Sequence, residues 1–298
     1  MSDSVRTLMV PVRAPYRLDL TATALRRLST NLVDVFDGTT YRRLIGDPAD
    51  PVLLEVRQDA PDALTLRVHG EPGLDAAALV RRMFGTEVDL AHFYRAAAEI
   101  PWLSALVERA RGVKSPRYPS LWETIVNAVV YQQISIHAAA AILRRVIERY
   151  AVVRHVAGEA IAAFPPPQTI VDADIPELRS LGLSVNKVVA LRTLGRAILD
   201  GEIDERAIEP MATPQLVEHL VAFKGIGPWT AAVIALRGFG RLDIFPMKDS
   251  GVARMLNELS GDPNVDTSAI LATLGDQRGM LYYHLLLGRL ASRGVIDL

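Results

Sequence analysis

The hydrophobic pattern of this chain changes near residue 100, and this change constrains the fold more than any other feature. Before it, apolar and polar residues alternate in TLMVPV, YRLDL, VLLEVRQ and ALTLRVHG. A period of two residues is typical of strands that bury one face. Turn-forming residues in FDGTT and GDPADP separate these segments, and the ranges 23–28 and 75–84 predict covering helices. Residues 1–100 therefore predict a small antiparallel sheet domain with helices.

From Pro101 onward the apolar residues recur with the period of helices. Gly, Pro and Asn interrupt the pattern at KSPRYPS, FPPPQ, GLS, KGIGP, GFGRLDIFP and SGDPN, as expected between helices. The predicted helices cover 102–110, 120–132, 136–150, 176–180, 186–200, 214–222, 228–237, 250–260, 267–274 and 279–293. The chain thus predicts an α+β protein in which residues 101–298 form an all-α second domain.

Composition limits the chemistry. Cysteine is absent, which excludes disulfides, thiolate nucleophiles and Cys-ligated zinc or iron–sulfur clusters. The six histidines show no i, i+4 pair, so we expect no metal held by side chains. The function predicted below also implies no organic cofactor. The net charge of −1 means that affinity for a polyanion must come from a local arrangement. Since no apolar run approaches about 18 residues and the start is unlike a signal peptide, we expect a cytoplasmic protein without a membrane partner.

The segment FKGIGPWTAAVIAL begins a helix in an unusual way, because Gly225 and Gly227 bracket Ile226 and Pro228 follows. Both glycines are free to adopt positive φ, which folds a tight turn and leaves successive N–H groups pointing outward. Pro228 suits the first helical position. Exposed amides at the positive end of a helix dipole form an anion site suited to a phosphodiester. A helix–helix corner with glycines chosen for packing is the alternative.

Asp249 follows Gly227 by 22 residues, in RLDIFPMKDSGVARM. A loop fixed by Pro246 would deliver its carboxylate to the start of a helix, where the dipole and free N–H groups stabilise it. An ordinary N-cap aspartate is the alternative. The combination of the Gly-rich turn and Pro-x-x-Asp is more specific than either feature alone.

KGIGPWTA followed by DIFPMKD resembles the helix-hairpin-helix (HhH-GPD) DNA glycosylases, and most closely their bacterial 3-methyladenine DNA glycosylase II type. The likeness covers roughly residues 116–292, including SLWETIVNAVVYQQIS and LGLSVNKVVALRTLGRAI. The first hundred residues are similar in kind to the subgroup's N-terminal antiparallel sheet domain, although that match is weaker. The resemblance implies that the second domain is an all-α glycosylase domain.

The resemblance also implies how DNA is held. Gln133 matches the position from which relatives push a side chain into the gap left by a flipped base, although a solvated polar residue is the alternative. We expect Gln132 and Ser135 to brace and cap that turn. The implied DNA-binding residues are Gln133, Lys224, Gly225, Ile226, Gly227 and Thr230, with Lys224 standing where relatives usually have proline. The resemblance further implies a monovalent cation, Na+ or K+, on the backbone carbonyls of Val221, Phe223 and Ile226.

For the base pocket, the resemblance implies that Trp229 is an aromatic wall on which an electron-poor base stacks. A core tryptophan is the alternative. Val233 and Gln277 stand where the subgroup's best-known pocket has further aromatics. Either other aromatic residues supply the stacking, or the substrate range differs. The candidates are Tyr131, Trp122 and Tyr282, with Tyr118 and Tyr283 also considered.

For the chemistry, the resemblance makes Asp249 the catalytic carboxylate, which stabilises the oxocarbenium-like sugar and orients water. Asp243 and Arg278 are expected to be structural. Bifunctional relatives carry a lysine two residues after the second glycine of the hairpin, and Trp229 occupies that position here. The implied enzyme therefore lacks lyase activity.

The function predicted from the sequence is removal of alkylated purines, of the 3-methyladenine and 7-methylguanine type, from damaged double-stranded DNA by a monomeric hydrolase that leaves an abasic site. A glycosylase for deaminated or oxidised bases and a non-catalytic module that binds damaged DNA are the alternatives. An unrelated helical protein with a chance G-x-G would show no salt-dependent DNA affinity.

Overall fold

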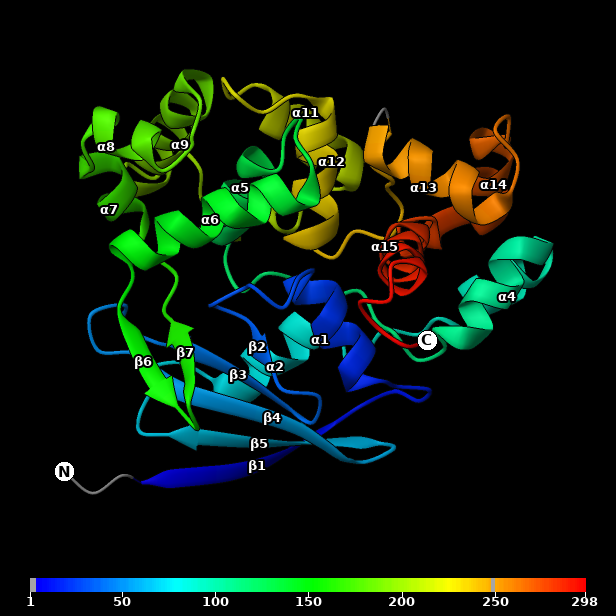
Figure 1. Cartoon of the computed structure of the whole chain (residues 1–298), viewed down its shortest axis with the longest axis horizontal. Coiled ribbons are helices and arrows are strands. Elements are labelled where there is room, and N and C mark those ends of the chain that lie inside the picture. Colours follow the sequence, from blue (N-terminus) through cyan, green and yellow to red (C-terminus); the bar gives the residue numbers. More distant parts are fainter. Residues whose placement is uncertain (1–3, 248–249) are drawn as a thin grey trace.

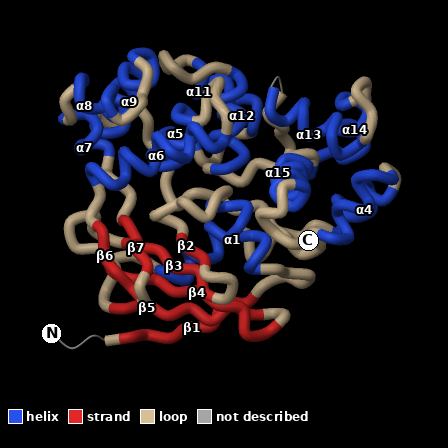
Figure 2. The backbone as a smooth tube through the Cα atoms, viewed as in Figure 1, coloured by secondary structure: helices blue, strands red, loops and turns tan. Residues whose placement is uncertain are grey.

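The computed structural model describes residues 4–247 and 250–298. A sheet forms one layer and the helices lie over it and beside it (Figures 1 and 2). The five-stranded sheet is antiparallel with the order β1-β5-β4-β3-β2, and a separate hairpin pairs β6 with β7. The strands are β1 (Val5–Pro11), β2 (Val35–Phe36), β3 (Thr40–Ile45), β4 (Val52–Ala60), β5 (Ala63–His69), β6 (Val153–Val156) and β7 (Glu159–Ala162).

Alternation of side chains explains the sheet. Leu64, Leu66 and Val68 of β5 are fully buried, and Leu66 pairs with Val56 of β4 on the same face. Helices α1 (Leu18–Arg26) and α2 (Ala76–Phe84) share a core with this face. The antiparallel sheet with covering helices is therefore confirmed.

The remaining helices follow the sequence pattern closely. They are α3 (Ala91–Ala98), α4 (Pro101–Arg109), α5 (Leu121–Val130), α6 (Ile136–Tyr150), α7 (Pro167–Asp172), α8 (Ile175–Ser180), α9 (Val185–Leu199), α10 (Glu205–Ile208), α11 (Thr213–Val221), α12 (Pro228–Arg237), α13 (Ser250–Ser260), α14 (Thr267–Leu274), the 3-10 turn η1 (Gly275–Gln277) and α15 (Met280–Ser292). Every helix predicted after residue 100 is confirmed, with ends that differ by at most two residues. Short α7 and α10, and α3 in the first hundred residues, were not predicted.

Two parts of the sequence interpretation were wrong. YRLDL was expected as a strand, but Leu18 begins α1, where Leu18, Ala22 and Leu25 line one helical face against the sheet. A short alternating run also fits a helix when apolar residues continue beyond it. The second error concerns residues 153–162, which were expected to lie in a wholly helical region but form the β6–β7 hairpin.

The hairpin is explained by a contact that is distant in the sequence. Ile161 and Ala163 form a small buried cluster with Leu44 of β3 and Val35 of β2. Strand β3 itself was not predicted, because TYRRLI does not alternate cleanly.

The helical half and the first hundred residues share a core. Leu20 and Ala24 of α1 and Phe93 of α3 are buried in one cluster with Leu281 and Leu285 of α15. A second cluster joins α5, α9 and α12. The division into domains 1–100 and 101–298 remains a prediction. Within the described residues, no helix is long and apolar enough to cross a membrane.

Candidate DNA-binding and active site

Helices α11 and α12 are joined by a tight turn at residues 222–227, which we call the hairpin. Gly225 has φ +102°, and a Cβ there would lie 2.6 Å from Cβ of Ala190 on α9, so glycine is required. Gly227 has φ −89° and ψ 175°, and a Cβ there would meet nothing within 4 Å. Of the two glycines that are free to adopt positive φ, only Gly225 does so. Pro228 begins α12, as predicted.

The backbone of the hairpin leaves polar groups available. The amide of Ile226 donates to the Phe223 carbonyl at 3.1 Å and closes the turn. Within residues 4–247 and 250–298, the amides of Gly225 and Gly227 donate to no protein acceptor, and the carbonyls of Val221 and Ile226 accept from no donor. Such amides suit an anion. Carbonyl oxygens are ligands for hard cations, so this donor set fits a monovalent ion.

The side chains at the hairpin differ in burial. Ile226 is buried in the helical core, whereas Lys224 is exposed. Thr230, in the first turn of α12, is also buried. Lys224 is therefore free to meet solvent or a ligand, while Thr230 contributes through its contacts inside the protein.

Residues 131–135, the loop between α5 and α6, contain an unusual backbone conformation. Gln133 has φ +58° and an exposed side chain. Non-glycine residues rarely adopt this region, and they do so where the surroundings enforce it. Ser135 caps α6 by accepting from the Ala138 amide at 3.2 Å, as predicted. The loop thus presents Gln133 outward at its turn.

Gln132 connects this loop to the hairpin. Its Nε2 donates to the Gly225 carbonyl at 3.1 Å and to Thr230 Oγ1 at 2.8 Å. The predicted bracing role of Gln132 is confirmed. These hydrogen bonds join residues that lie 93 and 98 positions apart in the sequence. Helices α5 and α12 are neighbours in the fold (Figure 1). Gln132 and Thr230 are hydrogen-bonded to each other, and in the sequence Tyr131 directly precedes Gln132 and Trp229 directly precedes Thr230.

Two of the predicted pocket residues meet at a buried arginine. The guanidinium of Arg27 lies 4.0 Å from the ring centroid of Tyr131, and its Nη2 donates to the Tyr282 hydroxyl at 3.3 Å. Burial raises the pKa of Tyr131, and the positive charge of Arg27 opposes that rise. Among the described residues Arg27 Nη1 has no hydrogen-bond acceptor. Tyr131, Tyr282 and Arg27 therefore form one cluster, which composition and spacing did not indicate.

The other aromatic candidates lie elsewhere. Trp122 is buried at the opposite end of α5, where its Nε1 donates to the Pro165 carbonyl at 2.9 Å. Trp122 precedes Tyr131 by nine positions, which corresponds to about 13 Å along the helix axis. Tyr118 and Tyr283 are buried, with hydroxyls that donate to Asn127 Oδ1 at 3.1 Å and to the Pro116 carbonyl at 3.2 Å.

The two positions that lack the subgroup's aromatics have other contacts. Val233 is part of the helical core. Gln277 Oε1 accepts from the Phe93 amide at 2.7 Å, and its Nε2 donates to the Asp89 carbonyl at 2.6 Å. Gln277 therefore joins η1 to the start of α3.

Asp249 lies outside the described residues, but the segment before it is well fixed. Gly279, at the start of α15, donates to the Leu242 carbonyl at 2.7 Å, and a Cβ there would lie 2.9 Å from the Ile244 carbonyl. Asp243 accepts from Thr213 Oγ1 at 2.8 Å, a contact that agrees with the structural role expected for it. Arg278 Nε donates to the Gly275 carbonyl at 2.7 Å, a structural contact with backbone.

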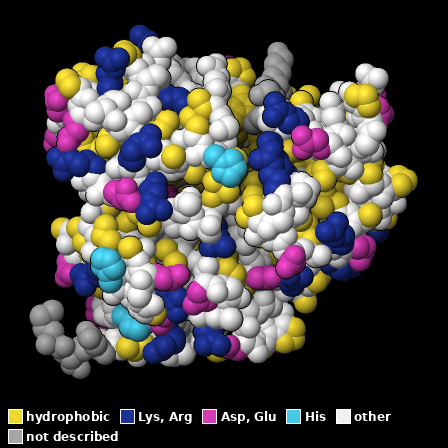
Figure 3. Space-filling view, in the orientation of Figure 1, with side chains coloured by type: hydrophobic (Ala, Val, Ile, Leu, Met, Phe, Trp, Pro, Cys, Tyr) yellow, Lys and Arg dark blue, Asp and Glu magenta, His cyan; other side chains and the backbone are white. Residues whose placement is uncertain are grey.

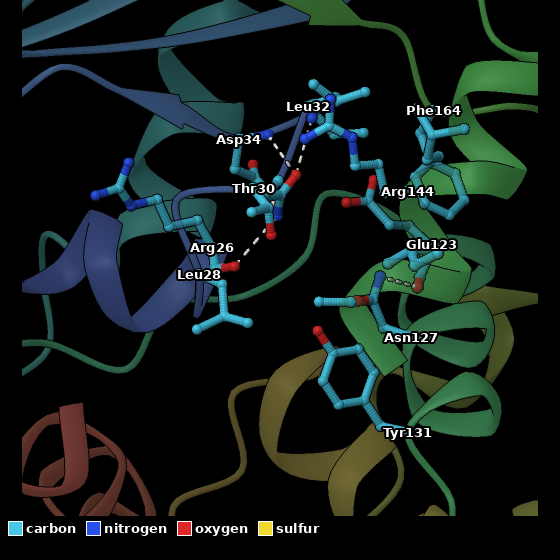
Figure 4. A pocket seen from close by; sticks show the side chains of 15 residues that line it. Arg26, Leu28, Thr30, Leu32, Asp34, Glu123, Asn127, Tyr131, Arg144 and Phe164 are labelled. Atoms are coloured by element: carbon cyan, nitrogen blue, oxygen red, sulfur yellow. Dashed lines mark hydrogen bonds between the residues drawn. The ribbon is translucent and has the colours of Figure 1, made fainter. Parts of the chain in front are cut away.

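A small cavity lies between residues 26–34 and helices α5 and α6 (Figure 4). Its volume is about 20 Å³, which is enough for about one water molecule and too small for a purine. Asp34 and Glu123 line it, and both pair with Arg43 of β3. Tyr131 lines it from α5. The cavity is therefore part of the joint between sheet and helices, not a base pocket.

Lys187 is a further residue that contacts the loop. From α9, its Nζ donates to the carbonyls of Val130 at 2.8 Å and Gln132 at 3.0 Å. Desolvation lowers the pKa of this amine. The segment Gly-Leu-Ser-x-x-Lys by itself indicates no role for its lysine. Its contacts could not be read there because they span more than 50 residues.

The face drawn in Figure 3 carries no large patch of a single charge. On the face in Figure 3, Lys and Arg side chains are spread among Asp and Glu side chains. This agrees with the net charge of −1. Any grip on a phosphate therefore depends on the local geometry of the hairpin.

A tight turn between two helices that presents unused amides is the arrangement of a helix-hairpin-helix protein. The model of the HhH-GPD superfamily of base excision DNA repair proteins matches residues 126–275, half of the chain. The chain belongs to this superfamily.

Individual relatives agree with the family. YfjP of Bacillus subtilis (strain 168), whose name gives a provisional assignment as a DNA-3-methyladenine glycosylase, is 24% identical over 257 residues, spanning 82% of this chain and 84% of that protein. DNA-3-methyladenine glycosylase 2 of Escherichia coli (strain K12) is 34% identical over 144 residues, which cover 45% of this chain and 46% of that protein. The solved structure of a 3-methyladenine DNA glycosylase from Archaeoglobus fulgidus has a TM-score of 0.76 at 21% identity, covering 94% of this chain and 97% of that chain. This last likeness supports the fold.

Proposed function

We propose that the protein is a DNA glycosylase that hydrolyses the N-glycosidic bond of alkylated purines in duplex DNA and leaves an abasic site. The observation that carries the proposal is the double hydrogen bond of Gln132, which holds the 131–135 loop against the hairpin. A base in duplex DNA must be rotated out of the stack before its glycosidic bond is reached. An enzyme that does this needs a phosphate grip and a wedge at a fixed separation. The names of the curated relatives support alkylated purines as the substrate class.

The proposed grip and wedge use residues already described. The amides of Gly225 and Gly227 bind a phosphodiester, with Lys224 as an additional exposed cation. The carbonyls of Val221, Phe223 and Ile226 would hold Na+ or K+, which supplies positive charge beside the phosphate. Gln133 fills the gap left by the flipped base. Its exposed side chain and left-handed backbone favour this role over that of an ordinary surface residue.

The proposed chemistry depends on a carboxylate and an aromatic wall. Trp229, half-buried in the first turn of α12, stacks on the flipped base. Asp249 stabilises the positive charge that develops on the sugar and orients the attacking water. Trp229 stands where an amine would be needed for Schiff-base chemistry, so the enzyme has no lyase activity. We expect it to act as a cytoplasmic monomer.

A glycosylase for deaminated or oxidised bases is the second candidate. Val233 is a core residue and Gln277 is bound to α3, so neither adds stacking surface to a base pocket. Cationic alkylated purines stack strongly on aromatic rings and are good leaving groups, whereas neutral lesions need hydrogen-bond readout. A pocket with fewer aromatics keeps neutral lesions as the alternative substrates.

The proposal is tested by comparing the native protein, Asp249→Asn and the matched control Asp243→Asn on a duplex with a single 7-methylguanine. We expect Asp249→Asn to lose at least about a hundredfold in single-turnover excision while it still binds the duplex. Asp243→Asn, whose amide oxygen can still accept from Thr213 Oγ1, should retain excision within about tenfold.

The product of the same reaction tests the monofunctional assignment. The abasic strand should stay intact until alkali is added, and borohydride should trap no covalent complex. Equal excision by native protein and Asp249→Asn would contradict the assigned carboxylate. Binding without excision by the native protein would favour a non-catalytic module.

A further inference from the structure

Lys187 makes contacts that the proposed chemistry does not use. Its amine extends from α9 to the end of α5 and donates to the carbonyls of Val130 and Gln132. We propose that Lys187 is a positioning residue, which holds the 131–135 loop in the conformation that presents Gln133 to DNA. The inference rests on the proposed function, in which Gln133 is the wedge that fills the gap left by the flipped base.

The two carbonyls are well placed to control the loop. Val130 is the last residue of α5, and its carbonyl has no partner within the helix. The Gln132 carbonyl belongs to the peptide bond between Gln132 and Gln133. A donor that fixes this peptide plane restricts the backbone at Gln133, where φ is +58°. The ammonium also lies at the negative end of the α5 dipole, which favours its charge.

The charge of Lys187 has no other evident use. Among the described residues it forms no ion pair within 4.0 Å, and its side chain is half-buried. Burial of an amine without a carboxylate is unfavourable, and it lowers the pKa of this lysine. The hydrogen bonds to the carbonyls of Val130 and Gln132 explain why an amine lies at this half-buried place.

Helix α9 supports the hairpin as well as the loop. Ala190 lies one turn after Lys187, and its side chain is the surface on which Gly225 packs. Gln132 closes the arrangement through its bonds to the Gly225 carbonyl and Thr230 Oγ1. Loss of the Lys187 amine would therefore loosen the peptide between Gln132 and Gln133, while the Gln132 side chain would still contact the hairpin and Ala190 would still support it.

The test compares native protein with Lys187→Met, Lys187→Arg and Arg196→Met. Lys187→Met keeps the aliphatic stem but removes the donors, and Lys187→Arg restores donors. Arg196, exposed on the same helix, controls for the loss of one positive charge. Four quantities are measured. They are hydrogen exchange of the loop amides in the free protein, fluorescence of 2-aminopurine beside the lesion, affinity for undamaged duplex, and single-turnover excision.

For Lys187→Met we expect exchange in the 131–135 loop to accelerate by about tenfold, with the hairpin amides unchanged. The 2-aminopurine signal of unstacking should be lost and excision should fall by about tenfold to a hundredfold, as for small misplacements in a site. Affinity for undamaged duplex should match that of Arg196→Met within about twofold. Lys187→Arg should recover most of the excision rate.

Native exchange and native unstacking in Lys187→Met would overturn the inference. So would faster exchange throughout the helical half that Lys187→Arg does not reverse, since that pattern marks a residue needed only for stability. If the native protein excises no base, the proposed function fails. The exchange of the loop in the free protein then still decides whether Lys187 fixes it.

Discussion

At the scale of single residues, the two glycines of the hairpin differ in what they require. Gly225 combines positive φ with close packing on Ala190, whereas Gly227 has an ordinary extended conformation in open space. A side chain at Gly225 must either strain the backbone or displace the turn from α9. The conformation that exposes the amides therefore depends on Gly225.

Gly225→Ala should lower the free energy of unfolding by about 1–3 kcal/mol and weaken duplex binding by about tenfold or more. Gly227→Ala is the matched control and should cost less than about 1 kcal/mol, because alanine is only a poorer helix cap there. Urea unfolding and a binding titration measure both effects. Equal losses in the two variants would show that φ at residue 225 does not organise the hairpin.

At the scale of elements, α5 joins the sheet to the DNA-binding loop. Near its start, Glu123 is buried and pairs with Arg43 of β3. At its end, Gln132 and Lys187 fix the loop to α12 and α9. Helix α5 thus connects the sheet to the DNA-binding loop, and the buried ion pair of Glu123 with Arg43 joins its first turn to β3.

Stability should depend on pH through Glu123. Burial raises the pKa of this carboxyl from its usual 4.5 to about 7, although Arg43 opposes the rise. A carboxyl with a higher pKa when folded binds its proton preferentially in the folded state. Its contribution to stability is therefore fully present below about pH 4.5 and is lost as the pH rises through about 7.

The variant Glu123→Gln lacks this titration, so its free energy of unfolding relative to the native protein should increase from pH 5 to pH 8. Urea unfolding at several pH values measures this difference, in which other groups cancel. Glu148→Gln, at an exposed carboxyl on α6, should follow the native curve. A constant difference between Glu123→Gln and native protein would contradict the assignment.

Elements with clear local signals could be predicted from sequence, and those fixed by distant contacts could not. The start of α12 could be predicted because Pro228 and the glycines before it are local signals. Strand β3 and the β6–β7 hairpin depend on pairing and on Leu44 against Ile161, which no local window contains. For the site, Gln132 could be expected to brace the loop, whereas Arg27 and Lys187 act on residues far away along the chain. Conformation at Gly227 was also beyond the sequence, because glycine permits both signs of φ.

At the scale of the whole molecule, positive and negative charges nearly cancel, and the face in Figure 3 shows Lys and Arg side chains spread among Asp and Glu side chains. With a net charge of −1, long-range attraction to DNA is weak, and a small number of phosphate contacts must supply the electrostatic part of binding. The dependence of affinity on salt counts those contacts.

The logarithm of duplex affinity should fall as the logarithm of salt concentration rises, and Lys224→Met should reduce the slope by about one. Arg57→Met, on the sheet and paired with Asp59, is the control and should leave the slope unchanged. An unchanged slope in Lys224→Met would remove Lys224 from the phosphate contacts. Affinity that is independent of salt in the native protein would argue against DNA as the ligand.

The central claim is that this protein releases alkylated purines from duplex DNA. The most direct measurement is incubation of native protein with duplex DNA treated with a methylating agent, followed by identification of the released bases by mass. We predict release of 3-methyladenine and 7-methylguanine, and none with Asp249→Asn. Release of hypoxanthine, uracil or oxidised guanine from matching duplexes, with no methylpurine from the methylated one, would contradict the alkylpurine assignment. Binding of every duplex without any release would contradict the assignment as a glycosylase.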